Sequence, residues 1–427
     1  MHILFLTDNF PPEVNAPASR TFEHGREWVK AGHRVTVITC APNFPTGKVF
    51  AGYRNRLWSR ETMDGIEVIR VWSYITANEG VLRRTLDYVS YMVSATVAAL
   101  FVPKVDVIVA TSPQFFTACA GWAVGTLKRR PWVFELRDLW PESIRAVGAI
   151  RNERLLGWLE ALELFLYRRA ARVVSVTHAF RDKLIARGID GDKIAVVTNG
   201  ADLGRFSPRP KDEALAHELG LTGRFAAGYV GTHGMAHALD TILDAAMLLK
   251  ETVGGRDIRF ILLGHGAAKA ALKARAEALG LTSVIFIDSV PKDEVARYWS
   301  LLDVSIIHLK RTELFTTVIP SKLFECMAMG VPVLHGVAGE SAAIVEREGV
   351  GLVFEPENPE ALAAQLARLA TRADELREMA LKGPQAAARY DRAALAKDML
   401  RILQDTSDAA RARRRPRQAG EASPSRS

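Results

Sequence analysis

Cysteine is scarce in this sequence, with 3 residues among 427, and they lie far apart at Cys40, Cys119 and Cys326. They form no CxxC pair and leave an odd number, which argues against a disulfide framework and against a zinc site. Unpaired cysteines of this kind are typical of proteins that stay in a reducing compartment. We therefore expect a cytoplasmic protein without a zinc site.

Long hydrophobic runs are also missing. The most apolar stretch, 88–102, falls short of the roughly 20 residues that span a bilayer as a helix, and Pro103 and Asp106 close it. The opening residues MHILFLTD turn polar too early for a secretory signal and indicate a first strand instead. We expect neither a transmembrane helix nor a signal peptide.

Two common nucleotide-binding motifs are absent as well. No GK[ST] occurs in the chain, and Gly264-His265-Gly266 lacks the third glycine of the GxGxxG pattern. These absences argue against a P-loop kinase and against an enzyme that transfers hydride from a dinucleotide.

The composition that is present indicates a folded protein with anionic partners. Hydrophobic residues make up 48% and charged residues 24%, as in ordinary globular proteins. The length is roughly three times a domain of about 150 residues, which predicts two lobes with a cleft between them. The net charge of +8 favours nucleic acid, anionic lipid or a diphosphate. Nucleic acid is not expected, because no aromatic residues accompany the short basic tail.

Short β-branched runs alternate with longer helical patterns, which is typical of parallel sheets with crossover helices. We predict an α/β protein with an N-terminal lobe at 1–200, a linker at 201–212 and a C-terminal lobe at 213–387. A helix at about 388–405 is expected to cross back onto the first lobe, and the basic tail at 410–427 to be disordered. The predicted strands are HILFLT, RVTVIT, IEVIRV, DVIVAT, WVFEL, RVVSV and KIAVVT, followed by FAAGYVG, IRFILLG, SVIFID, DVSIIH, VPVLHG and VGLVF.

A glycine-containing loop follows the first strand of the second series. The strand FAAGYV runs into Gly231-Thr232-His233-Gly234 and then into a helical pattern. Glycines let backbone amides approach a pyrophosphate closely, and the start of a helix favours negative charge. We interpret this loop as an anion cradle, with Gly264 after the next strand as a further donor contact.

The segment PSKLFECMAMGVPVL, which begins at Pro320, carries the most specific signal. Lys322 and Glu325 stand three residues apart, on one face of a helix near its start. At that place Lys322 can bind a diphosphate and Glu325 can accept bonds from sugar hydroxyls, with Ser321 beside them. An exposed ion pair between the two charged residues is the alternative.

Two loops of the first lobe are predicted to contact the acceptor. The loop FPPEVNAPASR precedes a helix, and a helix start with Asn15 and Arg20 nearby suits an anionic group. The strand WVFEL then delivers Arg137, Asp138 and, slightly further on, Trp140 and Glu142. Asp138 suits a sugar hydroxyl and Arg137 a diphosphate, whereas Trp140 is expected to pack. The alternatives are an ordinary turn at the first loop and an ion pair of Arg137 with Asp138 or Glu142 at the second.

With these motifs the chain resembles family 4 of the glycosyltransferases, which have the GT-B fold of two Rossmann-like lobes. The resemblance covers nearly the whole chain. It implies retaining transfer from a nucleoside-diphosphate sugar, with UDP-sugars favoured, without cofactor or metal. It also implies that Glu325 binds the donor ribose, that Gly231–Gly234 is the phosphate loop, and that the loop with Ser289 and Val290 flanks the base.

More narrowly, the motifs DNFPPEVNAPASR, ELRDLWPES, YVGTHGMAHAL and the PSK helix resemble a bacterial branch of WbuB-type N-acetyl-fucosaminyltransferases. Two departures from the family pattern stand out. Thr317 takes the place of a glutamate near the donor sugar, and the usual basic pair in and after the phosphate loop is replaced by histidines. Lys322 is then expected to carry more of the phosphate charge, with Lys310 or Arg311, which are alternatively a solvated loop.

The segment VLRRTLDYVSYMVSATVAALFV combines Arg83 and Arg84 with an apolar face. A buried crossover helix of the first sheet is the favoured interpretation, because its serines, threonine and alanines suit close helix packing. A helix in the membrane interface is the alternative, and the two can apply to different faces. We expect a peripheral enzyme on the inner face of the plasma membrane that acts on a polyprenyl-diphosphate-linked saccharide in surface-polysaccharide assembly. A nucleotide-sugar 2-epimerase of the same fold and a non-catalytic partner subunit are the competing hypotheses.

Overall fold

The computed structural model describes residues 1–44, 46–76, 81–140, 142, 145, 152–250 and 257–414. The chain divides into two compact units. Unit 1 comprises Met1–Val176, Leu184–Val197 and Ala396–Ser427, and unit 2 comprises Thr177–Lys183 and Thr198–Leu395. The division after Val197 lies a few residues before the predicted linker. The residues 201–212 belong to unit 2, where Ala201 and Phe206 are buried in the core.

Unit 1 is built on an eight-stranded sheet with the order β3-β4-β2-β1-β5-β6-β7-β8. All neighbouring strands are parallel except β3 and β4. The central strands are fully buried, which explains why they are continuous apolar runs. In chain order the strands are β1 (His2–Leu6), β2 (Arg34–Cys40), β3 (Trp58–Met63), β4 (Ile66–Val71), β5 (Val107–Thr111), β6 (Trp132–Leu136), β7 (Arg172–Ser175) and β8 (Ile194–Val196).

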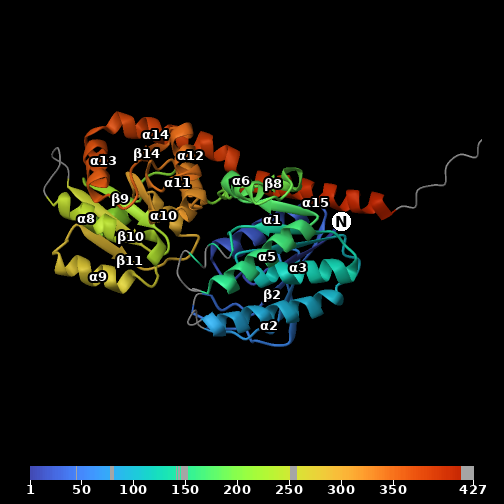
Figure 1. Ribbon diagram of the computed structural model, residues 1–427. Coiled ribbons are helices and arrows are strands. Elements are labelled where there is room, and N and C mark those ends of the chain that lie inside the picture. Colours follow the sequence, from blue (N-terminus) through green and yellow to red (C-terminus); the bar gives the residue numbers. More distant parts are fainter. Residues whose placement is uncertain are drawn as a thin grey trace, which may run out of the picture. The chain divides into compact units, whose positions relative to one another are not determined.

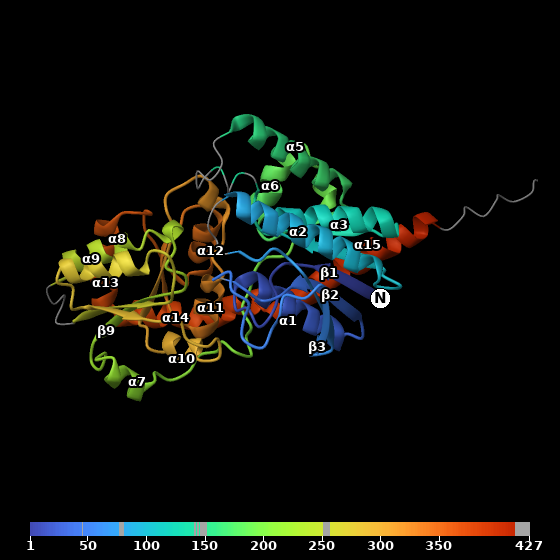
Figure 2. The same cartoon turned by 90° about the horizontal axis from the view of Figure 1, so that it is seen from below.

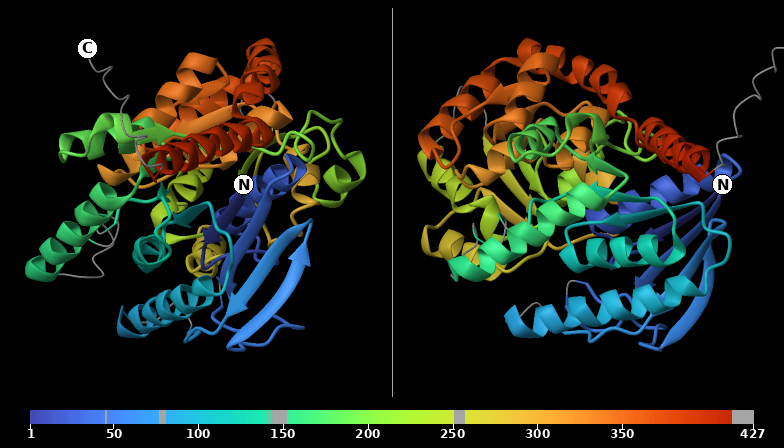
Figure 3. Two further views of the ribbon diagram at one scale, coloured as in Figure 1. Left: turned by 90° about the vertical axis from the view of Figure 1, so that its right-hand side faces the viewer. Right: turned by 45° about the vertical axis from the view of Figure 1, so that its right-hand side comes forward.

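The sequence predicted every strand of this sheet except β3. This strand forms an antiparallel hairpin with β4 at the edge of the sheet, which the left view of Figure 3 shows in blue. Its sequence WSRETM is partly exposed and carries Arg60 and Glu61, because an edge strand covered on one side needs few apolar residues. No apolar run therefore marked it.

Helices cover this sheet, and the last of them comes from the C-terminal end of the chain (Figure 1). That helix, α15, enters unit 1 at Ala396, whose carbonyl accepts a hydrogen bond from Trp28 Nε1 at 2.8 Å. The predicted disorder of residues 410–414 is wrong: α15 continues to Arg414, and Arg411 pairs with Asp106 at 2.7 Å. The rest of the tail lies outside the described residues. The helices of unit 1 are α1 (Ala16–Lys30), α2 (Val81–Leu100), α3 (Phe115–Lys128), α5 (Glu153–Arg169) and most of α15 (Arg392–Arg414), whereas α6 (His178–Ala186) is divided between the units, with residues 178–183 in unit 2.

Unit 2 contains a six-stranded parallel sheet with the order β11-β10-β9-β12-β13-β14, and all six strands were predicted. The order reverses between β9 and β12, and in such sheets ligands bind beyond the carboxyl ends of the strands at this point. The strands are β9 (Phe225–Val230), β10 (Ile258–Leu263), β11 (Val284–Ile287), β12 (Val304–His308), β13 (Val333–Gly336) and β14 (Gly351–Val353).

The core of unit 2 has one apolar cluster on each face of its sheet. Alternate residues of β9 belong to the two clusters, with Ala226 and Val230 in one and Phe225 and Tyr229 in the other. The helix α11 packs into the first cluster through Leu323 and its apolar neighbours. The α-helices of this unit are α7 (Glu213–Glu218), α8 (Asp240–Leu248), α9 (Lys269–Ala278), α10 (Val295–Trp299), α11 (Lys322–Met329), α12 (Glu340–Glu348), α13 (Pro359–Thr371) and α14 (Ala373–Ala387).

Candidate functional site

The loop Gly231–Gly234 lies against the loop that begins at Gly264, where β9 and β10 end. A side chain at Gly264 is impossible, because a Cβ there would stand 1.8 Å from the carbonyl oxygen of Gly231. The amide of Gly231 donates to Leu263 O at 2.9 Å, and that of His233 to His265 O at 2.9 Å. Among the described residues, the amides of Thr232 and Gly234 have no acceptor. Of the four amides that were predicted to cradle an anion, those of Thr232 and Gly234 can therefore still bind an anion.

Lys322, the first residue of α11, places its ammonium beside this loop. Its Nζ lies 3.7 Å from the ring centroid of Tyr229, and a Cβ built on Gly231 would be 2.8 Å from it. The side chain is half-buried, but the nitrogen is shielded from water and has no hydrogen-bond partner among the described residues. Burial lowers the pKa of Lys322 to about 7. A buried ammonium without an anion is costly, so this position favours binding of an anionic ligand.

Lys269, which the sequence analysis missed, differs from Lys322 because its ammonium is fully hydrogen-bonded within the protein. Lys269, the first residue of α9, donates to Gly264 O at 2.7 Å, to Ile287 O at 2.8 Å and to Asp288 Oδ1 at 2.6 Å. An ammonium has three donors, and all three are used here. Lys269 therefore fixes the loops after β10 and β11 and is not available to a ligand. The sequence could have indicated Lys269 as a residue near the site, because it lies five residues after Gly264 and at the start of a helix.

The histidines of the loop are neutral at neutral pH. His233 is fully buried, and burial, together with the charges of Lys269 and Lys322, lowers its pKa to about 4. Burial followed by the charge of Lys322 lowers the pKa of His237 to about 3. Neither ring can therefore supply the positive charge of the missing basic pair. The cation that directly contacts this loop is Lys322, whose ammonium lies beside Gly231.

Glu325 lies one turn further along α11. Burial raises the pKa of this carboxyl above its usual value, although the charges of Arg392, Lys292 and Lys322 act in the opposite direction. The exposed ion pair with Lys322, considered as an alternative, is not formed between these two described residues. The two groups therefore do not neutralise each other, and the carboxyl of Glu325 also interacts with the side chain of Trp299.

The other predicted donor residues surround the same strand ends. The amide of Lys310 donates to Ala236 O at 2.9 Å, which brings the segment after β12 beside the residues that follow the loop Gly231–Gly234. Arg311 instead pairs with Glu355 at 2.6 Å in an exposed position, as the solvated alternative predicted. Ser289 is exposed and Val290 is half-buried in the loop after β11. Ser321 precedes α11 without capping it through its side chain.

Thr317, which replaces the glutamate of the family pattern, is buried. Its hydroxyl donates to Leu314 O at 2.6 Å within the same short 3-10 helix, Leu314–Thr317. A side chain held in this way does not reproduce the extended carboxylate of a glutamate. The side chain at this position therefore differs from the carboxylate of the family pattern.

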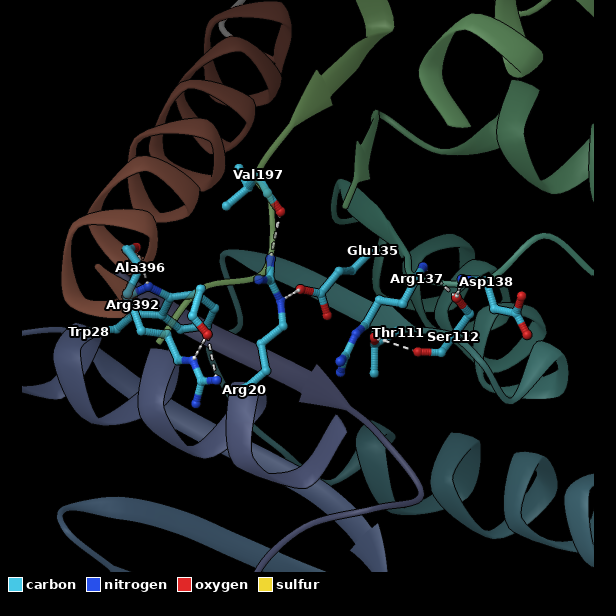
Figure 4. A network of polar contacts seen from close by, with 11 residues as sticks. Arg20, Trp28, Thr111, Ser112, Glu135, Arg137, Asp138, Val197, Arg392 and Ala396 are labelled. Carbon is cyan, nitrogen blue, oxygen red and sulfur yellow. Dashed lines mark hydrogen bonds and ion pairs between the residues drawn. The ribbon is translucent and has the colours of Figure 1, made fainter. Parts of the chain in front are cut away.

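In unit 1, Arg20 lies in the interior at 2% exposure. Figure 4 shows its side chain between Glu135 and Val197. Its Nε pairs with Glu135 Oε1 at 2.9 Å, and its NH2 group donates to Val197 O at 3.0 Å. Burial acts to raise the pKa of Glu135, but the charges of Arg20 and Arg137 outweigh it and lower the pKa. This placement changes the predicted role of Arg20 from an acceptor contact to a support for Glu135.

Ser112 holds the backbone of the predicted acceptor residues. Its Oγ accepts hydrogen bonds from the amides of Arg137 at 2.7 Å and Asp138 at 3.2 Å, and Figure 4 shows the two side chains beside it. The sequence analysis missed Ser112, although it follows β5, the neighbour of β6, at the same edge of the sheet. Asn15 is the N-cap of α1 and accepts from Ala18 N at 2.9 Å, so part of its amide group serves the helix.

Trp140 packs as expected. Its ring stacks on Phe115 of α3, with centroids 4.4 Å apart and planes inclined by 9°. Glu142 is half-buried, and residues 141, 143 and 144 next to it lie outside the described residues.

Within the part of the chain that the structure describes, no helix is long and apolar enough to cross a membrane. The described residues also contain no group of three or more His, Cys, Asp or Glu side chains arranged to hold a metal ion.

Comparison with known proteins places both halves of the chain in related families. Residues 15–200 match the family described as a glycosyl transferase 4-like domain, and residues 224–372 match the glycosyl transferases group 1. The chain is 25% identical to the colanic acid biosynthesis glycosyl transferase WcaI of Escherichia coli over 381 residues. The aligned region covers 85% of this chain and 91% of WcaI.

Solved structures show the same fold. Sucrose-phosphate synthase from Thermosynechococcus elongatus matches with a TM-score of 0.74 at 14% identity, over 96% of this chain and 99% of that one. HepE of Anabaena, solved with UDP-glucose, matches with a TM-score of 0.70 at 18% identity, over 95% of this chain and all (100%) of that one. At such identities the similarity concerns the fold alone.

Proposed function

Because the chain is a family 4 glycosyltransferase with the GT-B fold, we propose that it transfers a sugar, with retention of configuration, from a nucleoside diphosphate to a lipid-diphosphate-linked saccharide. The acceptor would be a polyprenyl-diphosphate-linked saccharide of surface-polysaccharide or O-antigen assembly. Its similarity to WcaI, whose name refers to colanic acid biosynthesis, supports this setting.

The buried ammonium of Lys322 carries the donor part of the proposal. During transfer, negative charge grows on the departing diphosphate, and groups already aimed at that charge lower the barrier. Lys322 would supply the positive charge, and the unused amides of Thr232 and Gly234 would supply donors. With these groups the reaction needs neither a metal nor a cofactor.

The nucleoside and the sugar are assigned to the neighbouring residues. Glu325 would bind the ribose, and the loop with Ser289 and Val290 would flank the base. A UDP-sugar is favoured, and the binding of UDP-glucose by HepE, a protein of the same fold, agrees with this choice. The buried Thr317 fits a donor that differs from common hexoses, such as the N-acetylated deoxy sugar of the WbuB-type branch.

The acceptor is assigned to unit 1. Asp138, whose backbone Ser112 holds, would orient the acceptor hydroxyl, and Arg137 would bind the lipid diphosphate. A guanidinium binds two phosphate oxygens at once, which suits this role better than the histidine usual in the family.

Turnover with and without acceptor tests this function. We expect the purified chain to release nucleoside diphosphate from a UDP-sugar when a lipid-diphosphate-linked saccharide is added, and NMR of the product to show the anomeric configuration of the donor. Screening GDP- and dTDP-sugars in parallel identifies the base. Conversion of the nucleotide sugar into an epimer without acceptor would instead support the 2-epimerase and contradict the proposal.

The exposed side of α2 supports the proposed position on a membrane surface. Its inner face, with Tyr91, Ala95 and Ala99, is buried, and α2 packs beside α3 (Figure 2). The opposite face exposes apolar residues at helical spacing, followed directly by the 68% exposed Phe101. The buried face agrees with the crossover-helix hypothesis, and the exposed face supports the proposal of a membrane contact. The exposed apolar residues are Leu82, Leu86, Val93, Val97 and Leu100.

Basic residues border this apolar face at both ends, with Arg83 and Arg84 at its start and Lys104 beyond Phe101. Apolar side chains flanked by positive charge suit the headgroup region of an anionic bilayer. We expect the double variant Val97→Glu/Leu100→Glu to stop floating with vesicles that contain phosphatidylglycerol. The control Leu381→Glu, at an exposed leucine of unit 2, should float like the unchanged chain. Flotation of both variants would contradict docking through α2.

A further inference from the structure

One buried side chain, Tyr229, touches both parts of the diphosphate site. It is the fifth residue of β9 and is fully buried. Its ring face lies under Lys322 Nζ at 3.7 Å, and its hydroxyl donates to the carbonyl oxygen of Thr232 at 2.8 Å. The ring therefore contacts the cation, and the hydroxyl contacts the loop that contains the amides of Thr232 and Gly234.

We propose that Tyr229 is the positioning residue of the diphosphate site, holding the ammonium of Lys322 with its ring and the Thr232 peptide with its hydroxyl. This inference rests on the proposed donor function of Lys322. Tyr229 touches protein groups and acts on the ligand through them.

An aromatic ring suits this task because it attracts a cation without neutralising it. The negative face of the ring favours the ammonium at this spot, but it carries no net charge. A carboxylate in the same place would form an ion pair with Lys322 and compete with the diphosphate. With Tyr229 as its partner, Lys322 keeps its charge uncompensated until an anion arrives.

The hydroxyl fixes the loop in the conformation that leaves two amides open. The peptide group between Thr232 and His233 is held at both ends. Its carbonyl oxygen accepts from the hydroxyl of Tyr229, and its N–H donates to His265 O. The neighbouring amides of Thr232 and Gly234 remain without an acceptor in the described structure. Losing the tether would let the loop rotate and would scatter these donors.

The surroundings of Tyr229 keep its ring in place. The rings of His233 and His237 lie with their centroids 5.9 and 5.7 Å from it, both at steep angles. The ionisable groups that act on Lys322 most strongly are Cys326 and Glu325, on its own helix. No second aromatic ring lies over the ammonium among the described residues, so the ring contact depends on Tyr229.

The test compares two changes at Tyr229 with Lys322→Met, by calorimetric titration of a UDP-sugar at several pH values around neutrality. Tyr229→Phe keeps the ring and loses the tether. We expect weaker binding, by about three- to tenfold, with an unchanged pH midpoint. Tyr229→Leu removes the ring, and we expect a loss of about tenfold or more together with a midpoint at lower pH, because the ammonium has lost its stabilising partner.

A purely structural tyrosine would change affinity or folding without moving the midpoint. Unchanged affinity in Tyr229→Phe and an unchanged midpoint in Tyr229→Leu would overturn the inference. If Tyr229→Leu does not fold, as thermal unfolding will show, Tyr229→Met serves for the same comparison. Full binding by Lys322→Met would instead refute the donor site itself, which separates failure of the proposed function from failure of this inference.

Discussion

Lys322→Met is expected to weaken binding of UDP and UDP-sugars by about 100-fold and at the same time to raise the melting temperature of the chain. The loss follows because a charge-assisted contact to a phosphate disappears from a water-excluded site. The gain follows because the ammonium is buried without a hydrogen-bond partner in the described structure, so an apolar side chain of similar length removes a desolvation penalty. Opposite effects on binding and stability are typical of a binding residue.

Calorimetric titration and thermal unfolding of the same preparations measure both effects. Lys382→Met is the matched control, because Lys382 is exposed on α14 and pairs with Glu378 on the same helix. It should leave UDP affinity unchanged and alter the melting temperature little. If Lys322→Met bound UDP as well as this control does, the assignment of Lys322 to the diphosphate would be wrong.

The affinity for a UDP-sugar is expected to fall as pH rises above about 7. Burial lowers the pKa of Lys322 to about 7 in the free protein, and only the protonated form carries the charge that the diphosphate needs. Binding therefore raises this pKa and takes up a proton. Affinity should be constant well below pH 7 and decrease by about tenfold per pH unit above it, until the pKa of the complex is reached.

A UDP-sugar is the right probe, because the terminal phosphate of UDP itself titrates near pH 6. The histidines beside Lys322 do not interfere, since the pKa of His233 is lowered to about 4 and that of His237 to about 3. Lys322→Arg is the matched control, because a guanidinium stays charged throughout this range. Its binding should lose the pH dependence. An arginine variant with the same decline as the unchanged chain would assign the titration to another group.

Local patterns predicted much of this fold because the relevant features are local. Buried parallel strands are continuous apolar runs, and glycines mark the places where two loops touch, as Gly264 and Gly231 do. The start of α11 at Lys322 follows from Pro320 and the apolar spacing behind it. The strand β3 escaped because an edge strand needs no such run.

The remaining features depend on contacts between distant residues. Arg20 looked like a surface cation at a helix start, yet it pairs with Glu135, 115 positions away in the chain. Tyr229 looked like an ordinary strand residue, and only the fold places Lys322 over its ring. A single sequence holds no signal for either pair, because each is decided by which strand ends become neighbours.

The helical conformation of residues 410–414 also depends on contacts with residues that are distant in the sequence. Residues 410–414 have the composition of a disordered segment, but packing of α15 along unit 1 and the pair of Arg411 with Asp106 continue the helix. Composition describes what a segment does alone, whereas its environment in the fold decides the outcome.

A crystal structure of the chain with a bound UDP-sugar tests the central claim most directly. The account predicts the diphosphate within hydrogen-bonding distance of Lys322 Nζ and of the amides of Thr232 and Gly234, with the ribose at Glu325. A diphosphate bound elsewhere, with Lys322 still resting on Tyr229 and touching no phosphate oxygen, would contradict it.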